Sequence, residues 1–333
     1  MVPFPASRCV SVEGAMAPDS DIIAQCTLAY LKKRSRWLLA HAFDVTSQAG
    51  EDGIISKALS AIADRNFWCV EFGAWDGKHL SNTYNLIENY SYHGVLIEAD
   101  PKKYSKLLAT YQHPDRIIPI NASVGFSSDD TLDAILAPCG IPKDFDLLSI
   151  DIDGNDYHVW NAISSFRPKI VLVEYNPTIS NSVTFVQRRA PDCSQGSSAA
   201  ALVALGKAKA YELIAVTHLN LIFVAQEYFH LFDIPDNSLE VMRDDSATPQ
   251  VFVGYDGRIF VGERNSLGQI HLPWHDIVIS EVDLQALPKC LQKYPYNYTG
   301  LERLAFAFFC LFNHPQTLVR YIRRRLSTTR SEK

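Results

Sequence analysis

The feature that constrains the fold most is a short apolar run closed by two glycines. Residues 67–77 read Phe-Trp-Cys-Val-Glu-Phe-Gly-Ala-Trp-Asp-Gly. The run is too short for a buried helix and turn formers follow it at once, which predicts a core strand of a parallel sheet. Gly73 and Gly77 let the backbone turn sharply and approach a ligand closely. With a helix predicted over 79–89, the order strand, glycine turn, helix is typical of a doubly wound nucleotide-binding sheet.

The glycine turn differs from the fingerprint of dinucleotide-binding proteins. Its glycines do not follow the G-x-G-x-x-G spacing, and the acidic Asp76 sits inside the turn. A carboxylate there would repel a pyrophosphate and attract a cationic ligand with a free amino group. The alternative is that Glu71 and Asp76 are ordinary helix-capping acids. This stretch alone leaves both interpretations open.

A second apolar run, residues 93–97, ends in another acid, Glu98. In doubly wound nucleotide-binding folds, an acid roughly 20 residues after the glycine turn accepts hydrogen bonds from the ribose hydroxyls. Glu98 is therefore the predicted ribose ligand. Asp100 is instead predicted to cap the helix that begins near Pro101.

Four short motifs lie along this part of the chain. They are Val-Glu-Phe-Gly-Ala-Trp-Asp-Gly (70–77), Ser-Asn-Thr (81–83), Leu-Ile-Glu-Ala-Asp-Pro (96–101) and Ile-Asp-Ile-Asp-Gly (150–154). Together they resemble the FkbM-type S-adenosylmethionine-dependent methyltransferases, over roughly residues 45–225. The resemblance implies a class I methyltransferase fold, which is α/β with a doubly wound, seven-stranded, Rossmann-like sheet. It also implies S-adenosylmethionine as the cofactor and, as in many known members, a sugar hydroxyl as the acceptor.

The cofactor residues that we expect come from these motifs and from the end of a third strand, 116–121. They are Glu71, Gly73, Ala74, Asp76, Gly77, Ser81, Asn82, Glu98, Ala99, Asn121, Ala122 and Asp151. In class I methyltransferases the end of the third strand often approaches the adenine, so Asn121 could supply an amide there. The alternative is a loop asparagine that is bonded to its own backbone.

Acids also stand at the ends of two further predicted strands, one that lies with its exit within 146–154 and one at 169–174. Asp151 and Asp153 belong to the first exit, and Glu174 and Asn176 to the second. The carboxyl ends of adjacent parallel strands converge on one crevice, so these side chains should lie near each other. Such a cluster suits Mg²⁺, with Asp151, Glu174 and Asn176 as predicted ligands. Without a metal, Asp151, Asp153 or His158 would act as the general base, or the acids would merely cap helices.

Two polar segments could cover the crevice. Residues 46–53 precede a predicted helix at 54–63, and they either help to close the cofactor pocket or cap that helix through Ser47 or Asp52. Residues 181–196 form a long stretch without periodicity, which is typical of a lid. Its Arg188 and Arg189 would hold an anionic group of the acceptor or else remain solvated.

Composition and net charge limit the class of protein to which this chain can belong. The chain has 333 residues, of which 47% are hydrophobic and 20% charged, as in ordinary globular proteins. We predict an N-terminal arm and helix (1–45), a methyltransferase domain (46–230) and a C-terminal extension with a hairpin and helices (231–333). The net charge of -6 argues against a general nucleic-acid binder.

The chain is expected to be cytoplasmic. Its seven cysteines are scattered and form no C-x-x-C pair, which predicts reduced thiols in the cytosol. Residues 1–21 do not read as a secretory signal, and no segment reaches the roughly 18 apolar residues of a membrane span. The apolar and basic run 318–326 predicts a membrane-surface helix, a helix packed on the domain, or a contact between two copies in a homodimer.

The predicted function is O-methylation of a hydroxyl on a sugar or small metabolite, so a small molecule or glycan is the expected partner and nucleic acid is not. A hydroxyl is a poor nucleophile at neutral pH and needs a base or a metal. Two alternatives stay open: a nucleotide-binding or regulatory module without catalysis, and an NAD-dependent oxidoreductase. Asp76 and the missing third glycine count against the second.

Overall fold

The computed structural model describes most of the chain between residues 20 and 313. The described ranges are 20–111, 113–127, 129–190, 193–245, 250–253, 259–262, 270–272, 277–279, 287–291 and 297–313. The predicted N-terminal arm and the basic apolar run at 318–326 lie outside these residues.

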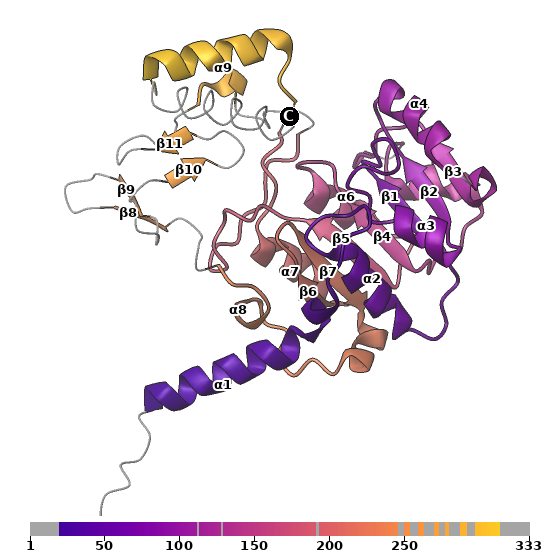
Figure 1. Ribbon diagram of the computed structural model, residues 1–333, viewed down its shortest axis with the longest axis horizontal. Coiled ribbons are helices and arrows are strands. Elements are labelled where there is room, and N and C mark those ends of the chain that lie inside the picture. Colours follow the sequence, from indigo (N-terminus) through magenta and orange to yellow (C-terminus); the bar gives the residue numbers. More distant parts are fainter. Residues whose placement is uncertain are drawn as a thin grey trace, which may run out of the picture.

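Seven strands form one twisted sheet (Figure 1). They are β1 (Trp68–Phe72), β2 (His93–Ile97), β3 (Ile117–Ile120), β4 (Leu147–Ile150), β5 (Ile170–Glu174), β6 (Tyr211–Val216) and β7 (Asn220–Ala225). Their order is β3-β2-β1-β4-β5-β7-β6. Strands β1 to β5 are parallel, whereas β7 runs antiparallel to both β5 and β6. This confirms the predicted doubly wound sheet and its closing hairpin.

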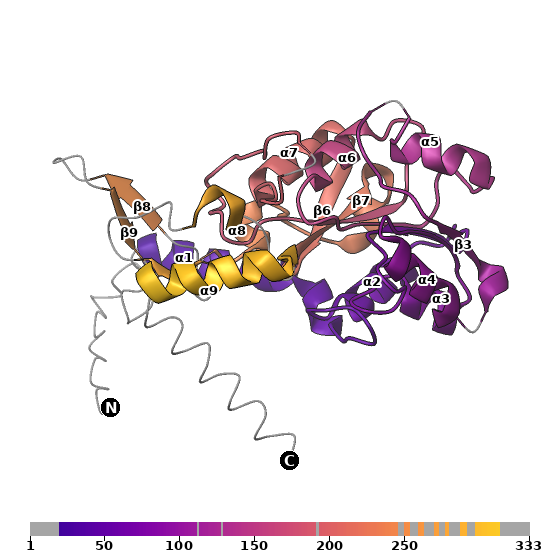
Figure 2. The ribbon, with the colours of Figure 1, turned by 90° about the horizontal axis from the view of Figure 1, so that it is seen from above.

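Helices cover both faces of the sheet (Figure 2). One face carries α2 (Glu51–Ser60), α3 (Tyr84–Tyr90) and α4 (Pro101–Thr110); the other carries α5 (Leu132–Leu136), α6 (Asp156–Ala162) and α7 (Ala199–Ala208). Short 3-10 turns, η2 (Pro114–Arg116) and η3 (Ala137–Cys139), lie between these elements. The central strands are almost wholly apolar because both of their faces are buried.

The helix predicted to start at His79 begins five residues later, at Tyr84. Asp76 accepts hydrogen bonds from the backbone N–H groups of Lys78 and His79, so this segment is a turn. Leu80 then adopts a left-handed φ of 57°, which a helix cannot contain. The delay leaves residues 79–82 at the edge of the sheet instead of on a helix.

The helix predicted within the N-terminal segment 1–45 is interrupted. It consists of α1 (Ser20–Ser35) and a 3-10 segment, η1 (Trp37–His41). The break falls at Arg36, whose Nε donates to the carbonyl of Val241, and the next residue, Trp37, donates from Nε1 to the carbonyl of Phe232 at 2.8 Å. Helix α1 extends away from the sheet in Figure 1.

In the described residues of the C-terminal extension, the elements before helix α9 are short. The elements are η4 (Gln226–Phe232), α8 (Leu239–Met242), β8 (Gln250–Val253), β9 (Ile259–Gly262), β10 (Ile270–Leu272), β11 (Ile277–Ile279), η5 (Lys289–Leu291) and α9 (Gly300–Asn313). Strands β8 and β9 pair antiparallel as the predicted hairpin. The six cysteines of the described segments are free thiols. Among the described helices, none combines the length and the apolar character needed to cross a membrane.

Candidate functional site

The register of the sheet brings four strand exits to one level. Phe72 at the end of β1 pairs with Ile97 of β2 and with Ile150 of β4, and Ile150 pairs with Val173 of β5. The residue after each of these four therefore stands at the same carboxyl edge. In spatial order these residues are Glu98, Gly73, Asp151 and Glu174.

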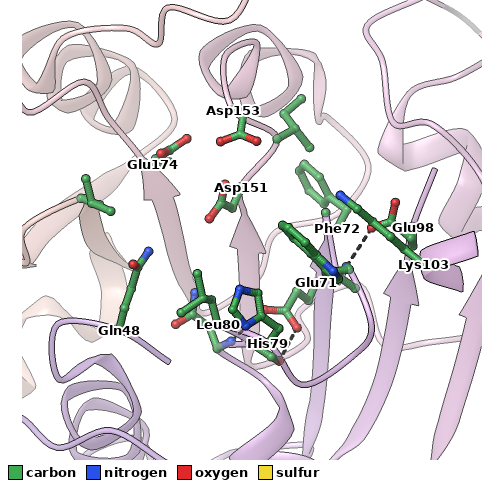
Figure 3. Close-up of a pocket in the computed structure, with 17 residues that line it drawn as sticks. Gln48, Glu71, Phe72, His79, Leu80, Glu98, Lys103, Asp151, Asp153 and Glu174 are labelled. Carbon is green, nitrogen blue, oxygen red and sulfur yellow. Dashed lines mark hydrogen bonds between the residues drawn. The ribbon is translucent and has the colours of Figure 1, made fainter. Parts of the chain in front are cut away.

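A pocket of about 490 Å³ opens along this edge (Figure 3). In Figure 3, Asp151, Asp153 and Glu174 point toward one another at one end, while Glu98 and Lys103 lie at the other. The lining residues are Gln48, Glu71, Phe72, Gly73, Ala74, Trp75, His79, Leu80, Ser81, Asn82, Glu98, Lys103, Asp151, Ile152, Asp153, Glu174 and Leu219. Nine of the residues proposed from the sequence as cofactor, catalytic or metal ligands thus meet in one place.

Glu71 organises the floor of the pocket. Its carboxylate is buried and accepts hydrogen bonds from the hydroxyls of Ser81 and Thr83, both at 2.6 Å, and from the backbone N–H of Asn82 at 2.8 Å. Burial raises the pKa of Glu71, although these three donors act in the opposite direction. The carboxylate thereby ties the segment before α3 to the end of β1.

Gly73 permits a close approach that no other residue allows. Its φ is 75°, and an added Cβ would stand 1.9 Å from the carbonyl oxygen of Asp151. The backbone turn after β1 can therefore lie directly against the exit of β4 only because this position lacks a side chain.

Glu98 is buried at the edge of the pocket and fixed by backbone groups. One carboxylate oxygen accepts from the N–H of Trp75 at 2.7 Å, and the other from the N–H of Asp100 at 2.7 Å. Asp100 itself accepts from two N–H groups of the first turn of α4, which confirms it as the helix cap. Each Glu98 oxygen retains a lone pair, so the carboxylate can still accept from a ligand hydroxyl.

Three carboxylates gather at the other end of the pocket. Ligand atoms of Asp151, Asp153 and Glu174 lie within 4.8 Å of one another. Asp156 fixes the turn between them, since its two oxygens accept from the N–H groups of Ile152 and of residue 154, both at 2.9 Å. Asp153 sits in this turn at a left-handed φ of 59°, a conformation that a non-glycine residue adopts at a cost.

Burial and the repulsion between like charges both raise pKa values in this cluster. Burial is the main cause that raises the pKa of Asp151 and of Glu174 well above the ordinary range, and the neighbouring carboxylates add to it. Burial also raises the pKa of Asp156, to about 6. The cluster therefore favours whatever reduces its negative charge: a proton, a cationic ligand or a metal ion.

Several residues predicted for the cofactor do not line the pocket: Asp76, Gly77, Ala99, Asn121 and Ala122. The Asp76 carboxylate faces its own turn, where N–H groups of His79 and Lys78 lower its pKa although burial acts to raise it. Asn121 donates its amide to the carbonyls of Glu98 and Ala99, at 2.7 and 3.2 Å, which belong to the exit of β2 and not to its own loop. These residues belong to the exits of β1, β2 and β3 and do not line the pocket.

His158 and Asn176 also stand elsewhere. The Nε2 of His158 lies 2.8 Å from the carbonyl of Gln187, and the residue does not line the pocket. Asn176 accepts two hydrogen bonds from Thr178 through Oδ1 and donates to the carbonyl of Gln195 at 2.7 Å. In the carboxylate cluster, Asp153 takes the place that the sequence suggested for Asn176.

The predicted lid is folded down onto the domain. Asn155 donates to the carbonyl of Ala190 at 2.9 Å, and Gln187 accepts from two backbone N–H groups of the same segment. Arg189 donates to the carbonyl of Phe126, and its guanidinium stacks on that ring at 4.3 Å from the centroid. Arg189 therefore has a protein partner in place of the predicted anionic one.

The pocket also includes side chains that the sequence did not single out. Lys103 lies over the ring of Trp75, with Nζ 3.7 Å from the centroid, and His79 meets the same ring edge-on. Gln48 reaches the pocket from the segment 46–53, where Ser47 Oγ accepts from the N–H of Asp52 and Asp52 accepts from the N–H and hydroxyl of Ser47. Helix α2 begins at Glu51, three residues before the predicted start, and its N-cap is Gly50, so neither Ser47 nor Asp52 occupies the N-cap position. Lys103 lies in the first turn of the helix that follows Glu98, and this position in the sequence could have identified it as a pocket residue.

Comparison with known proteins adds little to this picture. No family model and no curated protein matches the chain. Solved structures that resemble it include S-adenosylmethionine-dependent methyltransferases from Clostridium acetobutylicum ATCC 824 and from Aquifex aeolicus. The first is 10% identical, with 60% of this chain and 98% of that chain covered and a TM-score of 0.35. The second is 8% identical, with 60% and 97% covered and a TM-score of 0.33.

At these TM-scores the likeness supports no inference about activity, and the resemblance to the FkbM type remains a prediction. The fold is established by the strand order, the five parallel strands and the reversed β7. The chain has an α/β fold of the class I methyltransferase type, with a doubly wound, seven-stranded, Rossmann-like sheet.

Proposed function

We propose that the chain is an S-adenosylmethionine-dependent methyltransferase. The observation that carries this proposal is the charge of the pocket, in which five carboxylates (Glu71, Glu98, Asp151, Asp153 and Glu174) face one ammonium, that of Lys103. S-adenosylmethionine carries a sulfonium and an ammonium against a single carboxylate. A pocket of this charge attracts such a cation and repels the pyrophosphate of a dinucleotide.

The cofactor and the acceptor would bind at opposite ends of the pocket. Glu98 stands at the end of β2, where it would accept from the ribose hydroxyls. Asn82 lines the pocket, and its Oδ1 atom is buried and, within the described structure, has no hydrogen-bond partner, so this amide is the acceptor that we propose for the cofactor's ammonium. The methyl group would then face the carboxylates at the exits of β4 and β5.

The chemistry that this arrangement supports is methyl transfer to a hydroxyl of a sugar or small metabolite. A bond forms between the acceptor oxygen and the methyl carbon while the carbon–sulfur bond breaks, and the hydroxyl proton passes to a base. Asp151 is the base that we propose, with Asp153 beside it. Burial raises the pKa of Asp151, which brings its proton affinity closer to that of a working general base at neutral pH.

As an alternative to Asp151 as the base, a divalent cation fits the same cluster. Asp151, Asp153 and Glu174 offer three hard oxygen donors within 4.8 Å of one another, the donor type that Mg²⁺ prefers. These three residues would hold the ion, and a bound Mg²⁺ would supply Lewis-acid stabilisation of the acceptor's alkoxide character. The ion would also offset the repulsion between the carboxylates.

Calorimetric titration with Mg²⁺ tests the metal directly. We expect Asp153→Asn to weaken Mg²⁺ binding at least tenfold, because one of three charged ligands is lost. Asparagine tolerates the left-handed backbone at this position, so the turn should keep its shape. Asp130→Asn serves as the control and should bind Mg²⁺ as tightly as the wild type. If Asp153→Asn binds Mg²⁺ as the wild type does, the ion is not held here.

Titration with S-adenosylmethionine tests the cofactor. We expect Glu98→Gln to weaken binding about tenfold, since a charge-assisted hydrogen bond contributes roughly 1.5–3 kcal/mol. Asp100→Asn makes the same chemical change two residues away and keeps the helix cap, so it should bind like the wild type. NAD should give no binding heat. Binding of NAD in place of S-adenosylmethionine would favour the oxidoreductase, and binding without any turnover would favour a regulatory module.

A further inference from the structure

A second cavity lies at the C-terminal end of helix α1, where this helix meets the domain (Figure 1). Its volume is about 540 Å³, and it shares no residue with the pocket at the strand exits. Its lining residues, hereafter the α1 groove, are Tyr30, Lys33, Arg34, Trp37, Leu231, Phe232 and Asp233. A cavity of this size that combines apolar and aromatic walls with a few polar groups is typical of a small-molecule site.

One wall of the α1 groove comes from α1 and the start of η1. Lys33 and Arg34 stand three and four residues after Tyr30 on α1, so the three side chains share one side of the helix. Trp37 begins η1, and its Nε1 donates to the carbonyl of Phe232 at 2.8 Å. This hydrogen bond fixes the indole, so one aromatic ring of the groove is oriented before any ligand binds.

The opposite wall is the end of η4, and an ion pair joins it to α1. The guanidinium of Arg34 donates to the Asp233 carboxylate at 2.7 Å. Asp233 stands here at a left-handed φ of 46°, a conformation that a non-glycine residue adopts at a cost. Leu231, which is 41% exposed, adds apolar surface to this wall. The ion pair offsets the one carboxylate among the described residues that line the groove.

One positive charge of the α1 groove is left over. Lys33 is exposed, and its ammonium has no ion-pair or hydrogen-bond partner in the part of the chain that the structure describes. The rings of Tyr30 and Trp37 line the same cavity. Aromatic rings beside one unpaired cation suit a flat aromatic ligand with a single negative charge. A phosphate monoester, with about two negative charges at neutral pH, would leave one of them unpaired near Asp233.

We propose that the α1 groove binds a small aromatic carboxylate. The ring of the ligand would pack against Tyr30 and Trp37, and its carboxylate would accept a charge-assisted hydrogen bond from Lys33. Since the groove and the pocket at the strand exits have no residue in common, this site is separate from methyl transfer. The proposal therefore does not depend on the proposed function.

Equilibrium dialysis of the full wild-type chain with 2-naphthoate tests the ligand class. We expect 2-naphthoate to bind, and 2-naphthamide, which has the same rings without the charge, to bind about tenfold more weakly. Cyclohexanecarboxylate, which has the charge without an aromatic ring, should also bind about tenfold more weakly. Equal binding of the carboxylate and the amide overturns the proposal, as does the absence of any bound 2-naphthoate at millimolar concentration.

Two variants test whether the ligand lies in the α1 groove. Lys33→Gln should weaken the binding of 2-naphthoate about tenfold and leave that of 2-naphthamide unchanged. Tyr30→Ser, at a 62% exposed position, should weaken the binding of both about fivefold. The matched controls lie outside the groove: Lys32→Gln on the same helix, and Tyr90→Ser at a 48% exposed tyrosine.

Both controls should bind 2-naphthoate like the wild type. Thermal unfolding and S-adenosylmethionine binding should be the same in all four variants, because none of them changes a buried residue or the pocket at the strand exits. The proposal is overturned if Lys33→Gln binds 2-naphthoate as tightly as Lys32→Gln does. It is also overturned if Tyr30→Ser binds it as tightly as Tyr90→Ser does.

Discussion

Glu71→Ala is expected to destabilise the protein by about 4 kcal/mol, because it leaves three buried donors without an acceptor. Those donors are the hydroxyls of Ser81 and Thr83 and the N–H of Asn82. Ser81 in turn accepts from the N–H of Tyr84, the first residue of α3, so the start of that helix should loosen as well. Urea unfolding at pH 7 measures the loss.

Glu71→Gln separates the hydrogen bonds from the charge. The glutamine oxygen can still accept from Asn82 and its amide can donate to the Thr83 hydroxyl, whereas Ser81 Oγ already accepts from the N–H groups of Thr83 and Tyr84. Less than half of the destabilisation seen for alanine is therefore expected. If Glu71→Ala unfolds at the same urea concentration as the wild type, the carboxylate does not hold this segment.

Glu51→Gln is expected to stabilise the protein by as much as about 3 kcal/mol at pH 8 and to have little effect at pH 4. Glu51 is wholly buried, and burial raises its pKa to about 7 from the ordinary 4.5. Its Oε1 accepts from Thr217 at 2.6 Å and from Asn220 at 2.8 Å, and a glutamine oxygen can keep both bonds. The substitution therefore removes the charge and keeps the contacts.

The pH window follows from the raised pKa. Between pH 4.5 and about 7 the folded chain keeps the proton on Glu51 while the unfolded chain has released it, so stability falls as the pH rises. The stabilising contribution is complete below pH 4.5 and lost above about 7. Thermal unfolding from pH 4 to 8 should therefore show a smaller decline in Glu51→Gln. Glu240→Gln, at an exposed position, should follow the wild type, and a decline in Glu51→Gln as steep as in the wild type would contradict the assignment.

The sheet was predictable because its strands are short apolar runs separated by turn formers. Each of the five strands predicted from these runs is present, and the acids at the carboxyl ends of β1, β2, β4 and β5 meet as the rule for parallel strands requires. The spacing in sequence thus identified Glu71, Glu98, Asp151 and Glu174 as neighbours.

The direction of individual side chains was not predictable. Asp76 is within the right turn, but its carboxylate is used by that turn's own N–H groups, which no spacing reveals. His158 follows the right strand, yet the folded segment at 181–196 supplies it with a carbonyl partner. Lys103 and Gln48 line the pocket from a helix turn after Glu98 and from the segment 46–53; the sequence placed both segments near the pocket, and the tertiary structure shows which side chains reach it.

The central claim is that the pocket at the exits of β1, β2, β4 and β5 holds S-adenosylmethionine. A crystal structure of the chain with S-adenosylhomocysteine tests it most directly. The predicted result is a ligand whose ribose hydroxyls lie within about 3 Å of the Glu98 carboxylate and whose sulfur faces Asp151. A ligand found elsewhere, or no ligand in this pocket at saturating concentration, would contradict the claim.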